Sequence, residues 1–142
     1  MIRLFAFLSI LCLLSVLAAC SDMGDKPTDP GDPGPPDPPD PTVSYADDIQ
    51  PIFNNSCVGC HGVGGNAGLD LRPEVSHGNL VNVPSTESAL SLIEPEDPDN
   101  SWLYLKITGQ QNVGTEMPPG SGLDSTAAAL VQTWITEGAL DN

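Results

Sequence analysis

Two cysteines and a histidine form the pattern in this sequence that carries the most chemistry. Cys57 and Cys60 are two residues apart, and His61 follows directly in the run Cys57-Val58-Gly59-Cys60-His61. Cys-x-x-Cys-His is the attachment signature of a c-type haem. Two thiols at this spacing lie on neighbouring points of one turn, where both can bond to the same edge of a porphyrin, and the next residue can ligate the iron. The motif therefore predicts one covalent haem c on Cys57, Cys60 and His61.

The same pair of cysteines has three other interpretations, which the residues alone leave open. A thioredoxin-type redox pair would need a βαβ setting, and no such pattern surrounds Cys57 and Cys60. A zinc site would have only His77 as a further soft ligand and would need a carboxylate as well. A plain structural disulfide is the third interpretation. The haem site is favoured because the sequence also predicts export, and c-type haem is attached outside the cytoplasm in bacteria.

A second iron ligand is expected from a methionine further along the chain. Of the three methionines, Met1 and Met23 lie near the N-terminus, which leaves Met117 in the run Glu116-Met117-Pro118-Pro119-Gly120. Two prolines stiffen this loop, and a stiff loop presenting a thioether is what an axial ligand requires. Met117 opposite His61 would raise the haem potential relative to harder ligands. A methionine packed in a loop is the plain alternative. His77 is the competing ligand, although we rather expect it to be exposed or to bond a haem propionate.

The first 42 residues have the composition of export and linker segments. Arg3 precedes an apolar stretch over residues 4–16, and Leu17-Ala18-Ala19-Cys20 resembles the lipobox of bacterial lipoproteins. We therefore expect residues 1–19 to be a signal peptide and Cys20 to be acylated, which would anchor the chain to a membrane on the periplasmic side or at the cell surface. An uncleaved anchor helix is the alternative. Residues 20–42 are rich in Pro, Asp and Gly and are expected to be a disordered, extended linker.

The charge of the chain is strongly acidic. Four Lys and Arg residues oppose 19 Asp and Glu residues, for a net charge of −15. Nucleic-acid binding through a basic patch is therefore not expected. Redox partner proteins with a basic docking surface are favoured, in a salt-sensitive association. The plainer interpretation is that the acidic residues only keep the chain soluble.

Residues 43–142 are expected to fold as one all-α domain with short helices and long loops. Ser44 and Asp47 form a capping box ahead of Ile49, Ile52 and Phe53 on one helical face, with Pro51 forcing either a later start or a bend. Two further helices are predicted over residues 102–107, capped by Asn100 or Ser101, and over residues 125–137, capped by Asp124. Residues 62–84 are expected to be mostly loop, with one helical turn near residues 73–77 and a weak strand signal over residues 80–83.

Residues 47–139 resemble the monohaem cytochrome c superfamily, in particular the cytochrome c-like domains of exported bacterial proteins. Five runs carry the resemblance: Asp48-Ile49-Gln50-Pro51-Ile52-Phe53, Cys57-Val58-Gly59-Cys60-His61-Gly62, Pro95-Glu96-Asp97-Pro98-Asp99-Asn100-Ser101, Met117-Pro118-Pro119, and Trp134-Ile135 with Gly138-Ala139. The resemblance implies an all-α fold whose first and last helices cross beside the haem. It also implies thioether bonds at Cys57 and Cys60, with His61 as the proximal and Met117 as the distal iron ligand. Glu116 departs from the pattern, and residues 62–84 do not align with it.

The function expected from these features is one-electron transfer by a membrane-anchored carrier rather than an enzyme. A haem-based sensor or ligand-binding module is the first alternative, and it would require the Met117 bond to be weak or absent. An electron-donating subunit of a larger oxidoreductase is the second. A peroxidase is disfavoured because such cytochromes generally carry two haems and the sequence has one Cys-x-x-Cys-His motif. Aromatic and leucine side chains expected to pack in the core or against the haem are Trp102, Tyr104, Leu105, Leu130 and Trp134.

Overall fold

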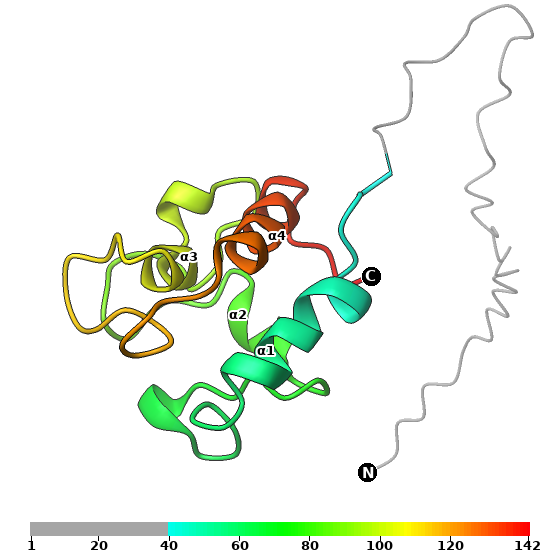
Figure 1. Cartoon of the computed structure of the whole chain (residues 1–142). Helices are drawn as coiled ribbons and strands as arrows, with labels where there is room; N and C mark the ends of the chain where they lie inside the picture. The colour runs from blue at the N-terminus through cyan, green and yellow to red at the C-terminus, as the bar shows by residue number, and fades with distance from the viewer. Residues whose placement is uncertain (1–39) are drawn as a thin grey trace, which may run out of the picture. The chain divides into compact units, whose positions relative to one another are not determined.

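The computed structural model describes residues 40–142, which fall in one compact unit (Figure 1). The elements in chain order are η1 (Tyr45–Ile49), α1 (Gln50–Ser56), η2 (Asn66–Gly68), α2 (Ser76–Leu80), η3 (Pro98–Asn100), α3 (Trp102–Ile107) and α4 (Ser125–Thr136). Helices joined by long loops make up this part of the chain, so the predicted all-α class is confirmed there. The predicted signal peptide, Cys20 and nearly all of the predicted linker lie outside the described residues. No helix within residues 40–142 has the length and apolar character needed to cross a membrane.

The predicted strand at residues 80–83 is wrong. Within residues 40–142 only isolated bridges form, and two of them join Val81 to Ile93 and Pro84 to Ser91. Asn82 has a φ of +58°, which breaks the extended conformation that a ladder needs. The helical turn expected near residues 73–77 is present, because the N–H groups of Val75 and Ser76 both donate to the Arg72 carbonyl, and α2 (Ser76–Leu80) follows it directly.

The first helical segment runs without a break from Tyr45 to Ser56, as a π-helix that becomes an α-helix at Gln50. Ser44 caps it, since its hydroxyl accepts a hydrogen bond from the Asp47 N–H at 3.2 Å. The carboxylate that reciprocates belongs to Asp48 rather than to the predicted Asp47, and it accepts the Ser44 N–H at 2.9 Å. Pro51 falls in the first turn of α1, where its missing N–H costs little. The conflict seen in the sequence is thus resolved by a change of helix type rather than by a later start.

Helices α3 and α4 form where the sequence predicts them. Asp124 caps α4 by accepting the N–H groups of Thr126 at 3.0 Å and Ala127 at 3.3 Å. Ser101 precedes α3, but its hydroxyl makes no cap bond to that helix. It instead donates to the Asp97 carbonyl at 2.9 Å and accepts the Glu94 N–H at 2.9 Å. Ser101 therefore ties the preceding loop to the start of α3.

The core lies where the first and last helices meet. Helix α4 contacts both η1 and α3, and its apolar residues form a stripe that is buried at Val131, Trp134 and Ile135, whereas Ala127 and Leu130 are only half-buried. Trp102 and Tyr104 are buried and Leu105 is half-buried. The same core cluster includes Tyr45, Ile49, Phe53, Leu80 and Ile93. This packing fixes α1, and hence the residues that follow it, relative to α3 and α4.

The two ends of the described chain are tied together beside η1 (Figure 1). The carbonyl of Asn142 accepts the Ala46 N–H at 2.9 Å, and its side-chain oxygen accepts the Tyr45 N–H at 2.8 Å. The Glu137 carboxylate accepts the backbone N–H groups of Thr42 at 3.0 Å and Val43 at 3.1 Å. These hydrogen bonds hold the pKa of Glu137 below its ordinary value, with the Thr42 side chain making the largest contribution.

Candidate cofactor site

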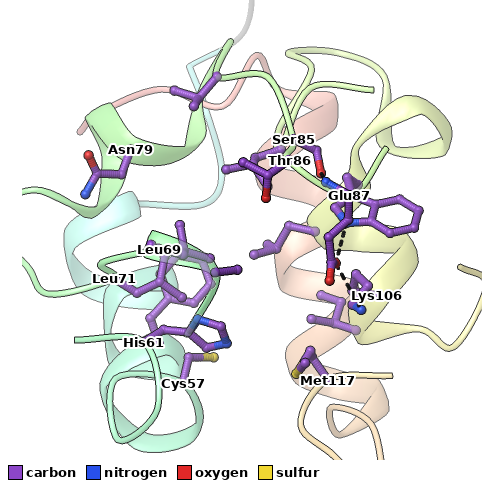
Figure 2. A pocket seen from close by; sticks show the side chains of 18 of the residues that line it. Cys57, His61, Leu69, Leu71, Asn79, Ser85, Thr86, Glu87, Lys106 and Met117 are labelled. Carbon is purple, nitrogen blue, oxygen red and sulfur yellow. Dashed lines mark hydrogen bonds and ion pairs between the residues drawn. The ribbon is translucent and has the colours of Figure 1, made fainter. Parts of the chain in front are cut away.

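Three of the predicted site residues meet at one cavity of about 430 Å³. Cys57 and His61 lie on one side of it and Met117 lies on the other, with the side chains facing each other (Figure 2). The lining between them is largely apolar and includes Phe53, Leu69, Leu71, Leu92, Leu103 and Ile107. A concave, mostly apolar cavity of this size with a few convergent polar groups is typical of a cofactor site.

The turn that carries Cys57 and His61 continues directly from α1. The Cys57 N–H donates to the Phe53 carbonyl at 2.8 Å, and the His61 N–H donates to the Cys57 carbonyl at 2.9 Å. This i to i+4 bond places both side chains on one face of the turn, toward the cavity. Cys60 is exposed and is not among the cavity-lining residues. The structure therefore brings together Cys57, His61 and Met117, and leaves Cys60 at the surface beside them.

The orientation of His61 depends on a residue that sequence reasoning missed. The Nδ1 atom of His61 lies 3.2 Å from the carbonyl oxygen of Asn66. A carbonyl only accepts, so Nδ1 carries the hydrogen in this contact, and Nε2 of the neutral ring keeps its lone pair for a metal. Gly65 makes this approach possible: a Cβ there would lie 2.8 Å from the Cys60 carbonyl oxygen and the His61 Cα. Such a second contact orients a ligating histidine and raises its basicity.

Met117 is held by the C-terminal end of α3. Its N–H donates to the Lys106 carbonyl at 2.8 Å, and the Leu123 N–H at the far side of the loop donates to the Ile107 carbonyl at 3.2 Å. Glu116, the departure noted in the sequence, lines a neighbouring cavity of about 340 Å³ and not the one that Met117 lines. Its carboxylate is therefore turned away from the thioether.

The environment of Cys57 argues against a thioredoxin-type nucleophile. Burial, with a smaller contribution from neighbouring Cys60, raises the pKa of the Cys57 thiol to about 11. Reactive cysteines of disulfide oxidoreductases have lowered pKa values instead. Cys57 and Cys60 are both free thiols here. Residues 40–142 also contain no group of three or more His, Cys, Asp or Glu side chains that could hold a metal ion, which weighs against a zinc site.

His77 lies outside the cavity. Its Nε2 is 2.8 Å from the Ala139 carbonyl oxygen, and its ring meets Tyr45 edge-on with 5.0 Å between the ring centroids. The side chain is only 23% exposed. Helix α2 thus turns His77 toward the end of α4, which separates it from the residues that face Met117.

The cavity has one charged wall, which the sequence did not single out. Glu87, Trp102 and Lys106 line it together, and the Lys106 ammonium lies 3.4 Å from a Glu87 carboxylate oxygen. Trp102 was expected in the core or against the haem, and it is buried and lines the cavity. The signals that could have marked this wall are a lysine among apolar residues in a short helix and an acidic residue in a distant loop.

These residues fit a haem. The cavity supplies a thiol next to a histidine on one side, a thioether on the other and apolar walls between them, which is the ligand chemistry of a c-type haem. The metal-free alternatives would leave the opposed imidazole and thioether without a role. The chain is thus built as a haem-binding cytochrome.

Comparison with known proteins agrees with this class. Residues 57–121 match a family model described as Planctomycete cytochrome C. The matched region begins at Cys57 and includes His61 and Met117, and it supports a cytochrome c-like domain in this part of the chain. That family implies a covalently bound haem c. No curated protein and no solved structure matches the chain.

Proposed function

We propose that the chain is a monohaem c-type cytochrome with a cytochrome c-like fold, and that it carries single electrons with its iron held between His61 and Met117. The observation that supports this most is the placement of these two side chains on facing walls of one cavity beside Cys57 (Figure 2). When bound, the haem supplies an iron that alternates between ferrous and ferric states. Met117 lies across the cavity from Cys57 and His61, so both walls of the cavity are needed to complete the site.

Each residue of the site has a separate task in this proposal. Cys57 and Cys60 form the thioether bonds that fix the cofactor to the turn after α1. His61 presents Nε2 because the Asn66 carbonyl holds its Nδ1–H. Met117 is presented by a loop bonded to the end of α3. The apolar lining excludes water, which limits reorganisation when the charge on the site changes.

With both axial positions filled, the chain would move electrons and make no bonds in a substrate, so we do not propose an enzyme. A haem-based sensor would need an open iron instead. Carbon monoxide separates the two functions: slow or weak binding to the reduced protein supports a carrier, and tight, fast binding supports a sensor.

The partner we propose is a redox protein with a basic docking surface. Arg72 and Lys106 are the only Lys or Arg residues among residues 40–142, and both are ion-paired, Arg72 with Asp70 at 2.8 Å and Lys106 with Glu87 at 3.4 Å. The other carboxylates of this region therefore give it a strongly negative field. Electron exchange with a basic partner should slow as ionic strength rises, and exchange with an acidic partner should quicken. An electron-exchange rate independent of salt would contradict this.

For location, we propose lipid anchoring through Cys20 on the periplasmic side of a membrane or at the cell surface. Replacing Cys20→Ser in the full chain should move the protein from the membrane fraction to the soluble fraction. Membrane association that survives this substitution would support the uncleaved anchor helix instead.

The experiment that tests the proposed function is mass analysis of the exported protein, produced with haem-attachment machinery. One covalent haem per chain is expected, and the single variants Cys57→Ser and Cys60→Ser should each lose one thioether bond. A chain that matures without haem under these conditions would contradict the proposal.

A further inference from the structure

An ion pair joins helix α3 to a loop at the charged wall of the cavity. Lys106 belongs to α3, and its side chain is 8% exposed, whereas that of Glu87 is 46% exposed and comes from the loop before Leu90. Burying an ammonium is costly unless it is paired, so the Glu87 carboxylate is needed where it lies. Figure 2 shows Glu87 and Lys106 above Met117 on the same side of the cavity.

The same carboxylate also engages Trp102. The indole N–H of Trp102 donates to the Glu87 oxygen that Lys106 contacts, at a long 3.4 Å. The ammonium lies 5.6 Å from the centroid of the Trp102 ring, within the range of a cation–π contact. One oxygen of Glu87 thus holds two side chains of α3 that lie one turn apart.

The loop that carries Met117 meets this ion pair on its other side. A Cβ on Gly114 would lie 2.8 Å from the Lys106 ammonium and 3.8 Å from a Glu87 oxygen, so the backbone of this loop passes close to both. Gly114 has a φ of +70° there, a conformation that glycine adopts at little cost. The Met117 N–H is bonded to the carbonyl of the same Lys106. The side chain and the backbone of Lys106 therefore touch the methionine loop at two points.

We propose that the Glu87–Lys106 ion pair is a clamp that positions the Met117 loop, so that the thioether stays on the cavity and keeps small ligands out. Lys106 and Glu87 are positioning residues in this scheme, because they act through Met117. The inference rests on the proposed ligation by His61 and Met117. Loss of either charge would break the ion pair between Glu87 and Lys106 and loosen the contact beside Gly114, which raises the fraction of time that Met117 spends away from the iron.

A different role for the pair would be to act on the haem only through its electric field. The two roles predict different results. Through the field alone, Lys106→Met would lower the reduction potential and Glu87→Gln would raise it, since the two charges have opposite signs. Through the clamp, both substitutions loosen the same thioether, so both lower the potential and both admit carbon monoxide more readily.

The test uses the haem-loaded protein with Glu87→Gln, Lys106→Met, the double variant, and Arg72→Gln as a control. Arg72→Gln removes the same charge from the other ion pair, which involves Asp70 and is not on the cavity. Each protein is measured for the carbon monoxide association rate when reduced, for the absorption band of sulfur–iron ligation when oxidised, and for its potential. We expect an association rate about three- to tenfold higher for either clamp variant, with a double variant no worse than the larger single effect, and little change for Arg72→Gln.

Potentials that shift in opposite directions with unchanged carbon monoxide binding would overturn the clamp, and so would clamp variants that behave like Arg72→Gln. Glu87→Gln keeps the length of a half-exposed side chain, so we expect this variant to fold. The test therefore does not depend on Lys106→Met alone. Met117→Ala is measured alongside. If it changes the spectrum while the clamp variants do not, only the clamp is wrong; if it changes nothing, the ligation fails and the clamp fails with it.

Discussion

The buried hydroxyl of Ser76 offers the sharpest test of the packing that supports the site. Tyr45, in η1, donates its hydroxyl hydrogen to Ser76 Oγ at 2.6 Å, and Ser76 in turn donates to the Gln50 side-chain oxygen at 2.5 Å. Gln50 completes the chain by donating to the carbonyl of Leu71, a residue of the cavity wall, at 2.9 Å. Ser76 is fully buried and Tyr45 is 3% exposed, so water cannot replace a lost partner.

The cost of Ser76→Ala follows from counting the groups it orphans. The substitution leaves the Tyr45 hydroxyl without an acceptor and the Gln50 oxygen without a donor. Each buried polar group left unpaired costs about 1–3 kcal/mol, so we expect a loss of about 2–4 kcal/mol after some relaxation. For a domain of this size that corresponds to a fall in Tm of about 10–20 °C. Tyr45→Phe removes only the donor and leaves Ser76 bonded to Gln50, so it should cost about 1 kcal/mol.

The assay is urea denaturation of the haem-loaded protein, followed by far-ultraviolet circular dichroism. Ser125→Ala is the control, because Ser125 is an exposed serine at the first position of α4, and it should change the free energy of unfolding by less than about 0.5 kcal/mol. In the Tyr45→Phe background, Ser76→Ala should cost less than it does alone, since one of the two orphans is then absent. The reasoning is refuted if Ser76→Ala costs no more than Tyr45→Phe, or if the two effects simply add.

Three other substitutions or conditions have expected outcomes. Asp124→Ala removes both cap bonds of α4 and should cost about 1 kcal/mol in urea denaturation, whereas Asp124→Asn keeps an acceptor and should cost clearly less; equal losses would contradict the cap. Burial raises the pKa of Tyr45 from 10.0 to about 12, so the stability that its protonated hydroxyl contributes is complete below pH 10 and is lost as the pH rises toward 12. The urea midpoint should therefore fall less steeply across this pH range for Tyr45→Phe than for the unaltered protein. Identical slopes for the two proteins would contradict the raised pKa. Hydrogen bonds lower the pKa of Glu137 below 4.5, so the stability that its carboxylate contributes is present above pH 4.5 and is lost as the pH falls through the lowered pKa. Glu137→Gln should flatten this part of the acid unfolding curve. An unaltered curve would show that these hydrogen bonds are not formed.

The parts of the molecule that the sequence predicts well are those specified by neighbouring residues. The Cys57 to His61 motif and the Met117-Pro118-Pro119 loop each indicate their chemistry within a few positions, and the structure places Cys57, His61 and Met117 around one cavity. Asp124 lies directly before an apolar stripe with helical spacing, so the sequence also predicts where α4 begins. Iron binding by these residues is a prediction, which the absorption spectrum of the haem-loaded protein tests.

The parts that the sequence predicts poorly depend on the exact course of the backbone or on contacts between distant segments. Nothing near Asn66 indicates that its carbonyl would orient His61, and nothing near Glu87 indicates that it would pair with Lys106 across the cavity. The strand signal at residues 80–83 failed because β-branched residues favour strands only when a partner ladder exists, and the left-handed backbone at Asn82 prevents one. The choice of Asp48 over Asp47 in the first cap follows from π-helical turns, which local patterns rarely reveal.

The central claim is that His61 and Met117 close the iron from opposite sides, and the most direct measurement is the absorption spectrum of the haem-loaded protein, oxidised and then reduced, beside that of Met117→Ala. The account predicts low-spin spectra for the unaltered protein, with the weak long-wavelength band of sulfur–iron ligation in the oxidised form. It also predicts that Met117→Ala loses this band, lowers the potential and binds carbon monoxide readily when reduced. A high-spin spectrum of the unaltered protein, or a Met117→Ala variant with unchanged spectrum and potential, would contradict the claim.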